Sequence, residues 1–77
     1  HIVLNVGEPF GDPRIPIHNI AIDDLAKAGF KLPFKDNSVG WLRMMDSLQL
    51  VPSNCVIGLM EEIYRVLIPG GWLSTAV

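Results

Sequence analysis

The feature that most constrains the fold of this chain is an amphipathic helical pattern that leads directly into a proline and two glycines. Apolar residues recur at spacings of three and four from Ser53 to Leu67, which predicts a helix with one apolar stripe. The stripe consists of Val56, Leu59, Met60, Ile63, Val66 and Leu67, and of these Val56, Met60, Ile63 and Leu67 are expected to turn inward. Pro69 ends such a helix, and the residues from Trp72 to Val77 then predict a strand.

Polar residues define the start and the outer face of this helix. Ser53 or Asn54 is expected to be the N-cap, because either side chain can accept a hydrogen bond from a free backbone N–H. Glu61, Glu62 and Arg65 are expected to face solvent, away from the apolar stripe. The four-residue spacing from Glu61 to Arg65 suits an ion pair on the helix surface.

Strands are predicted on both sides of this helix. Val39 to Met45 reads as a strand, and a strand, a helix and a strand form a βαβ unit with parallel strands. Farther upstream, Ile2 to Val6 is an apolar run that ends at Gly7, as a buried strand does. Ile17 to Ile22 predicts a second strand, and the prolines and glycines of residues 8–16 predict a loop between the two.

Composition limits the classes of protein to which the chain can belong. Hydrophobic residues make up 49% of the sequence, more than one small domain buries, so we expect self-association or a homo-oligomer. We interpret residues 1–77 as a single incomplete domain, a fragment of a larger α/β protein, because Val77 falls inside a predicted strand. The net charge of −2 and the scattered lysines and arginines predict neither nucleic-acid nor membrane binding.

Isolated reactive residues give little further chemistry. The single cysteine, Cys55, cannot form an internal disulfide, which fits a cytoplasmic protein. His18 has no second His, Cys or paired acid at ligand spacing, so no metal site is predicted. No apolar run approaches the roughly 20 residues that span a bilayer.

Two motifs carry a resemblance to a known family. They are Leu32-Pro33-Phe34-Lys35-Asp36-Asn37-Ser38 and Glu62-Ile63-Tyr64-Arg65-Val66-Leu67-Ile68-Pro69-Gly70-Gly71-Trp72-Leu73. Together they resemble the signature of class I S-adenosylmethionine-dependent methyltransferases, above all the small-molecule (type 11) branch. The resemblance covers Leu32 to Val77 well and the N-terminal part loosely. It implies a partial Rossmann-like methyltransferase fold, α/β, with a mainly parallel sheet and a covering helix. It also implies S-adenosylmethionine as cofactor and a small-molecule acceptor of the methyl group.

The resemblance implies cofactor-binding residues near the first two strands. Gly7 stands where the family has a glycine-rich turn close to the cofactor, although Glu8 and Pro9 replace the next two positions. An ordinary exit from a strand into a loop is the alternative for Gly7. Asp23 or Asp24 suits the ribose diol, because one carboxylate can accept from two hydroxyls. Asp24 and Leu25 also resemble the family's pair near the adenine, and the alternative for one of the aspartates is a helix N-cap.

A third cofactor-binding segment is implied after the strand from Val39 to Met45. Met45, Asp46 and Ser47 resemble the stretch that lines the cofactor and substrate cleft in the family. Asp46 is a weak candidate for a general base, and the alternative is a solvated loop carboxylate. Gln49 stands where the family commonly has a glutamate.

Two other functions remain open at this point. The chain can be a non-catalytic methyltransferase-like module that scaffolds a partner, which the Glu8-Pro9 replacement favours. It can also be a nicotinamide-dependent Rossmann enzyme, although it lacks the G-x-G-x-x-G motif of that class. Binding of S-adenosylmethionine, of NAD or of neither separates the three.

Overall fold

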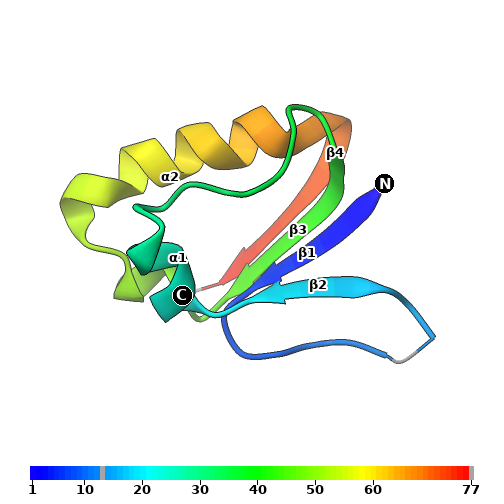
Figure 1. Cartoon of the computed structure of the whole chain (residues 1–77), viewed down its shortest axis with the longest axis horizontal. Coiled ribbons are helices and arrows are strands. Elements are labelled where there is room, and N and C mark those ends of the chain that lie inside the picture. The colour runs from blue at the N-terminus through cyan, green and yellow to red at the C-terminus, as the bar shows by residue number, and fades with distance from the viewer. Residues whose placement is uncertain (13, 77) are drawn as a thin grey trace.

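Four parallel strands form one sheet in the order β2-β1-β3-β4, in a computed structural model that describes residues 1–12 and 14–76. The strands are β1 (Ile2–Val6), β2 (Ile17–Ile20), β3 (Val39–Met45) and β4 (Leu67–Ala76). The helices are α1 (Ile22–Lys27), the short 3-10 helix η1 (Leu48–Leu50) and α2 (Ser53–Val66). Figure 1 shows α2 running along one side of the sheet. The predicted α/β architecture, a parallel sheet with a covering helix, is confirmed.

The core lies between α2 and the sheet face that it covers. Alternate residues of a strand point to opposite faces, so Leu4 and Val6 of β1 and Leu42 and Met44 of β3 share one face. All four are buried, as are three residues on the apolar side of α2, namely Leu59, Ile63 and Val66. Val56, Met60 and Leu67 are partly buried and pack against this core. The predicted apolar stripe is therefore confirmed, although α2 ends at Val66 and Leu67 already belongs to β4.

Two predictions about the polar residues of α2 are wrong. The N-cap is Pro52, with no side-chain hydrogen bond to the helix, and neither Ser53 nor Asn54 takes that position. Glu62 faces inward and is 8% exposed, because its carboxylate accepts the backbone N–H of Leu32 at 2.8 Å.

Arg65 connects α2 to the loop before β3 through hydrogen bonds. Its partner is Glu62, three residues earlier, and not Glu61 as the spacing suggested. Its guanidinium also donates to the carbonyl oxygens of Leu32 and Phe34, each at 2.9 Å, and to Asp36 Oδ1 at 2.8 Å. The loop is therefore fixed at several backbone groups, and it leads directly into β3.

The Pro-Gly-Gly segment lies inside β4, so the strand begins earlier than predicted. Val39 pairs with Leu67 and Trp41 pairs with Trp72, so two steps along β3 correspond to five along β4. The extra residues form a bulge, in which Gly70 has a φ of +78° that favours glycine. Regular pairing resumes at Trp72, where the strand was expected to start, and Val77 lies outside the described residues.

The connection from β1 to β2 crosses the sheet face opposite α2 without a helix in its described residues. This loop follows the blue-to-cyan trace of Figure 1, as predicted for residues 8–16, apart from residue 13, which is not described. The Phe10 N–H donates to Asn19 Oδ1 at 3.0 Å, and Asn19 Nδ2 donates to the Phe10 carbonyl at 3.2 Å. β2 is shorter than predicted, because Ile22 already begins α1.

Candidate functional site

A cavity of about 380 Å³ lies at the carboxyl ends of β1, β2 and β3. Ligands of open parallel α/β sheets bind at this edge, and the volume falls near the lower end of the usual range of about 300–1,000 Å³. The lining residues come from four segments of the chain: Gly7, Glu8, Pro9, Ala21, Ile22, Asp23, Arg43, Met45, Asp46, Ser47 and Leu50. Five of the residues predicted from the sequence are among them.

Gly7 directly follows β1 and has a backbone conformation that other residues rarely adopt. Its φ is +118°, and its N–H donates to the Ile20 carbonyl at 2.9 Å, which extends the pairing of β1 with β2. A Cβ at this position would come much closer than 3.0 Å to Ser47 Oγ. The backbone conformation and the approach to Ser47 therefore both favour glycine at this position, and the cofactor role that the resemblance implied for Gly7 stays a prediction.

The turn after β3 places Asp46 and Ser47 differently. Asp46 has a φ of +56°, and its N–H donates to the Ala76 carbonyl at 2.9 Å, so β4 fixes the position of the turn. Its side chain is exposed and lines the cavity. The Ser47 side chain is buried, with its hydroxyl 3.0 Å from the Met45 carbonyl and 3.3 Å from the Val6 carbonyl.

The three residues predicted around α1 separate in the structure. Asp23 lines the cavity, whereas Asp24 is exposed outside the lining. Leu25 is 1% exposed and belongs to the core. The N-cap of α1 is Ala21, without a side-chain hydrogen bond, so the alternative of an aspartate N-cap is wrong for both residues.

Arg43 is a lining residue that the sequence reasoning missed. It is the one charged residue in the strand segment Val39-Gly40-Trp41-Leu42-Arg43-Met44-Met45, and that isolation was the available signal. Its side chain lies on the sheet face opposite α2, where Nη1 donates to Asn5 Oδ1 at 3.0 Å. Its Cζ lies 3.8 Å from the centre of the Phe10 ring. A held guanidinium therefore forms part of the cavity wall.

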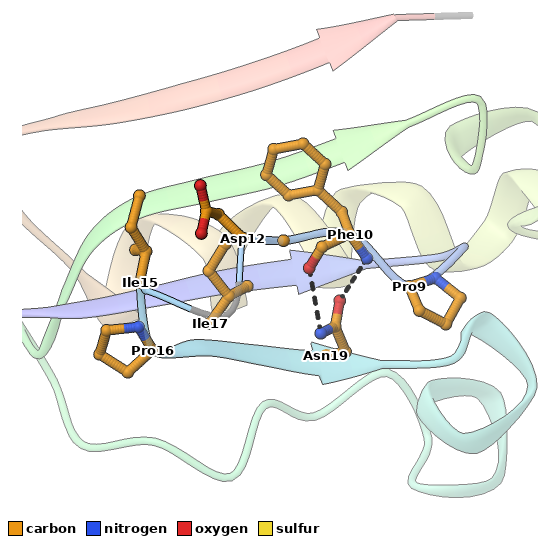
Figure 2. Close-up of a pocket in the computed structure, with 8 residues that line it drawn as sticks. Pro9, Phe10, Asp12, Ile15, Pro16, Ile17 and Asn19 are labelled. Carbon is orange, nitrogen blue, oxygen red and sulfur yellow. Dashed lines mark hydrogen bonds between the residues drawn. The ribbon is translucent and has the colours of Figure 1, made fainter.

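A second hollow, of about 500 Å³, lies between the loop after β1 and β2, and Figure 2 shows its lining. Phe10, Ile15 and Ile17 contribute apolar side chains to a lining that also contains Asp12 and Asn19, and Pro9 is shared with the first cavity. Its carboxylate, Asp12, pairs with Arg14, whose hydrogen bonds lower the pKa of Asp12. That carboxylate is therefore already occupied.

The described residues show neither a metal site nor a membrane span. Within residues 1–12 and 14–76, no three or more His, Cys, Asp or Glu side chains are grouped to hold a metal ion. None of the helices in this part of the chain has the length and apolar character needed to cross a membrane.

Comparison with known families gives one match. A family model described as a methyltransferase domain matches residues 14–75. The matched span includes Asp23, Arg43, Met45, Asp46 and Ser47 of the cavity, whereas the Gly7 turn precedes it. Searches of curated proteins and of solved structures found no match.

Proposed function

Because this chain belongs to the methyltransferase domain family, we propose that its cavity binds S-adenosylmethionine and that the protein methylates a small-molecule acceptor. The observation that carries the proposal is the convergence of Gly7, Asp23 and the Met45–Ser47 segment on one cavity. These residues lie far apart in the sequence and meet where parallel α/β sheets bind ligands.

The chemistry of the lining fits this cofactor. S-adenosylmethionine presents a ribose diol, an ammonium, a sulfonium and a carboxylate, together with an apolar purine. The cavity offers carboxylates from Glu8, Asp23 and Asp46 for the diol and the cations. Arg43 offers a cation for the carboxylate, and Ile22, Met45 and Leu50 offer apolar contact surface.

Each residue has a distinct role in the proposed reaction. When bound, S-adenosylmethionine supplies an electrophilic methyl group. Asp23, in the first turn of α1, accepts hydrogen bonds from the ribose hydroxyls. Asp46 borders the acceptor and receives the proton that the acceptor nucleophile loses. The remaining contribution is positioning, since holding two reactants in line removes much of the entropic barrier.

One observation favours a non-catalytic scaffold as a second candidate. Glu8 and Pro9 form the cavity wall directly after Gly7, and a proline has no N–H with which to hold a ligand. The described residues of the crossover from β1 to β2 also contain no helix, so no helix N-terminus approaches the cavity from that connection.

Titration calorimetry on the intact protein separates the candidates. We expect S-adenosylmethionine and S-adenosylhomocysteine to bind with a stoichiometry of about one, and NAD not to bind. Transfer of a labelled methyl group to a panel of small-molecule nucleophiles then identifies the acceptor. Binding of none of the three would favour the scaffold, and binding of NAD alone would favour a nicotinamide enzyme.

A further inference from the structure

We propose that Arg43 is a specificity-determining residue that binds a ligand carboxylate in the cavity, with its guanidinium held in place by Asn5 and Phe10. This inference rests on the proposed function, because it names the chemical group that the same cavity recognises. A carboxylate can come from the amino-acid end of the cofactor or from the methyl acceptor.

Arg43 carries a positive charge on a half-buried side chain. A cation that is partly removed from water requires a counter-charge or hydrogen-bond acceptors. The other two arginines, Arg14 and Arg65, each form an ion pair with a carboxylate. Among residues 1–12 and 14–76, no carboxylate forms an ion pair with Arg43. The charge of Arg43 can therefore pair with an anionic group of a ligand in the cavity.

The Arg43 guanidinium is held in position by its neighbours Asn5 and Phe10. Asn5 is 1% exposed, and its Nδ2 donates to the Glu8 carbonyl at 2.7 Å and to Asn19 Oδ1 at 2.9 Å. These bonds fix the amide so that Oδ1 accepts from Arg43 Nη1. The Phe10 ring stacks against the guanidinium, and the Phe10 backbone N–H is held by Asn19. An arginine held in this way loses little entropy when it binds a carboxylate.

Arg43 keeps N–H donors with which it can bind a ligand. A guanidinium carries five N–H groups, and one hydrogen bond of Arg43, to Asn5, is found among the described side chains. The remaining N–H groups suit a carboxylate, which can accept two parallel hydrogen bonds from one guanidinium.

Arg43 shares the cavity wall with charged residues of the opposite sign. Glu8, Asp23 and Asp46 line the same cavity, so its wall combines three carboxylates with one guanidinium. A ligand that carries both a cation and an anion complements such a wall. The amino-acid end of S-adenosylmethionine has this character, and so does an amino-acid-like acceptor.

The test compares two nucleosides that differ in the amino-acid end. S-adenosylhomocysteine has the carboxylate, whereas methylthioadenosine lacks it. We expect Arg43→Gln to weaken binding of S-adenosylhomocysteine roughly 10- to 150-fold, the effect of losing a charged hydrogen bond, and to leave methylthioadenosine unchanged. Arg43→Lys keeps the charge without the fork and should have an intermediate effect. Arg14→Gln is the matched control, since Arg14 is paired outside the cavity, and it should change neither affinity.

Acetate distinguishes the two sources of the carboxylate. It is titrated into the protein with and without saturating S-adenosylhomocysteine, and Trp41, which contacts Phe10, reports binding by fluorescence. Acetate binding that persists beside the nucleoside and disappears in Arg43→Gln assigns the carboxylate to the acceptor. Competition between acetate and S-adenosylhomocysteine assigns it to the cofactor.

Two results would overturn the proposal. One is an equal loss of both nucleosides in Arg43→Gln, which would mean that the substitution disturbs the whole cavity. The other is wild-type affinity of Arg43→Gln for S-adenosylhomocysteine and for acetate. A wild-type protein that binds neither nucleoside would refute the proposed function, while acetate binding to that protein would still decide the role of Arg43.

Discussion

Glu62 and Arg65 form an ion pair on the side of α2 that faces the loop before β3, with 2.7 Å between Glu62 Oε2 and Arg65 Nε. Both residues also bind the Leu32 backbone, Glu62 its N–H and Arg65 its carbonyl oxygen. The Arg65 hydrogen bond, followed by that of the Leu32 N–H, lowers the pKa of Glu62 from 4.5 to about 2. The pair therefore joins α2 to the loop, and the strength of this connection depends on the ionisation of the Glu62 carboxyl group.

This shift predicts how stability depends on pH. The folded-state pKa of Glu62 is below the unfolded value, so its contribution to stability is present above about pH 4.5 and is lost as the pH falls toward 2. Urea unfolding at a series of pH values should show this loss, and Glu62→Gln should remove much of it. Glu61→Gln, at an exposed neighbouring position, should retain the wild-type profile. Identical acid profiles for Glu62→Gln and the wild type would contradict the prediction.

Replacing Gly7 with alanine should destabilise the protein by about 1–3 kcal/mol, the usual cost of forcing a side chain into a sparsely populated backbone conformation. The φ of +118° and the approach to Ser47 Oγ both oppose a Cβ at this position. Adding Ser47→Ala should recover part of the loss, since the Ser47 Cβ lies 3.5 Å from the added atom, an ordinary contact. Denaturant unfolding measures both variants. A double variant no more stable than Gly7→Ala would show that Ser47 is not the obstacle.

The two neighbouring aspartates should differ in cofactor binding. Asp23 lines the cavity and Asp24 does not, although both lie in the first turn of α1. We expect Asp23→Asn to weaken binding of S-adenosylmethionine by about 1–3 kcal/mol and Asp24→Asn to leave it unchanged. Calorimetry measures the dissociation constant of each variant. Both substitutions remove one negative charge, so Asp24→Asn controls for the change of net charge. Equal effects would remove the ribose role from Asp23.

We propose that the protein self-associates through exposed apolar side chains on the sheet face opposite α2, and Trp72 is the residue to test. It is 74% exposed on an edge strand, and it lines a hollow with Trp41 and Ser74 on the sheet face opposite α2. Light scattering over a range of concentrations should show association that Trp72→Ser reduces. Tyr64→Ser, on the outer side of α2 and 70% exposed, serves as the control. A wild-type protein that stays monomeric at high concentration would refute this prediction.

The elements with strong local periodicity could be predicted from the sequence. The bounds of β1 and β3 match the predicted strands, and α2 ends one residue earlier than expected. The helical spacing by itself places Glu62 on the buried side of α2, which it shares with Leu59, Ile63 and Val66. Its charge led to the opposite assignment, because the compensating groups come from Leu32 and Arg65. A partner thirty residues away leaves no mark on local spacing.

Part of the site followed from topology, and the rest depended on distant contacts. Parallel strands bring their carboxyl ends to one edge, which is why Gly7, Asp23 and Asp46 meet. Leu25 lies on the side of α1 that faces the core. A helix of six residues is too short for its apolar spacing to predict which side is buried. Arg43 depends on Asn5 and Phe10, which precede it by more than thirty residues.

The parallel pairing of every strand has a consequence for how the chain folds. β1 is an interior strand, and both of its neighbours, β2 and β3, follow it in the sequence. None of the three strand pairs is a hairpin. Each pair therefore loses chain entropy when its connection closes, before the stabilising hydrogen bonds between its strands can form. During synthesis, β1 leaves the ribosome with two open edges, and the second stays open until β3 has emerged. Slow folding and a transient risk of aggregation are therefore built into the order of the strands.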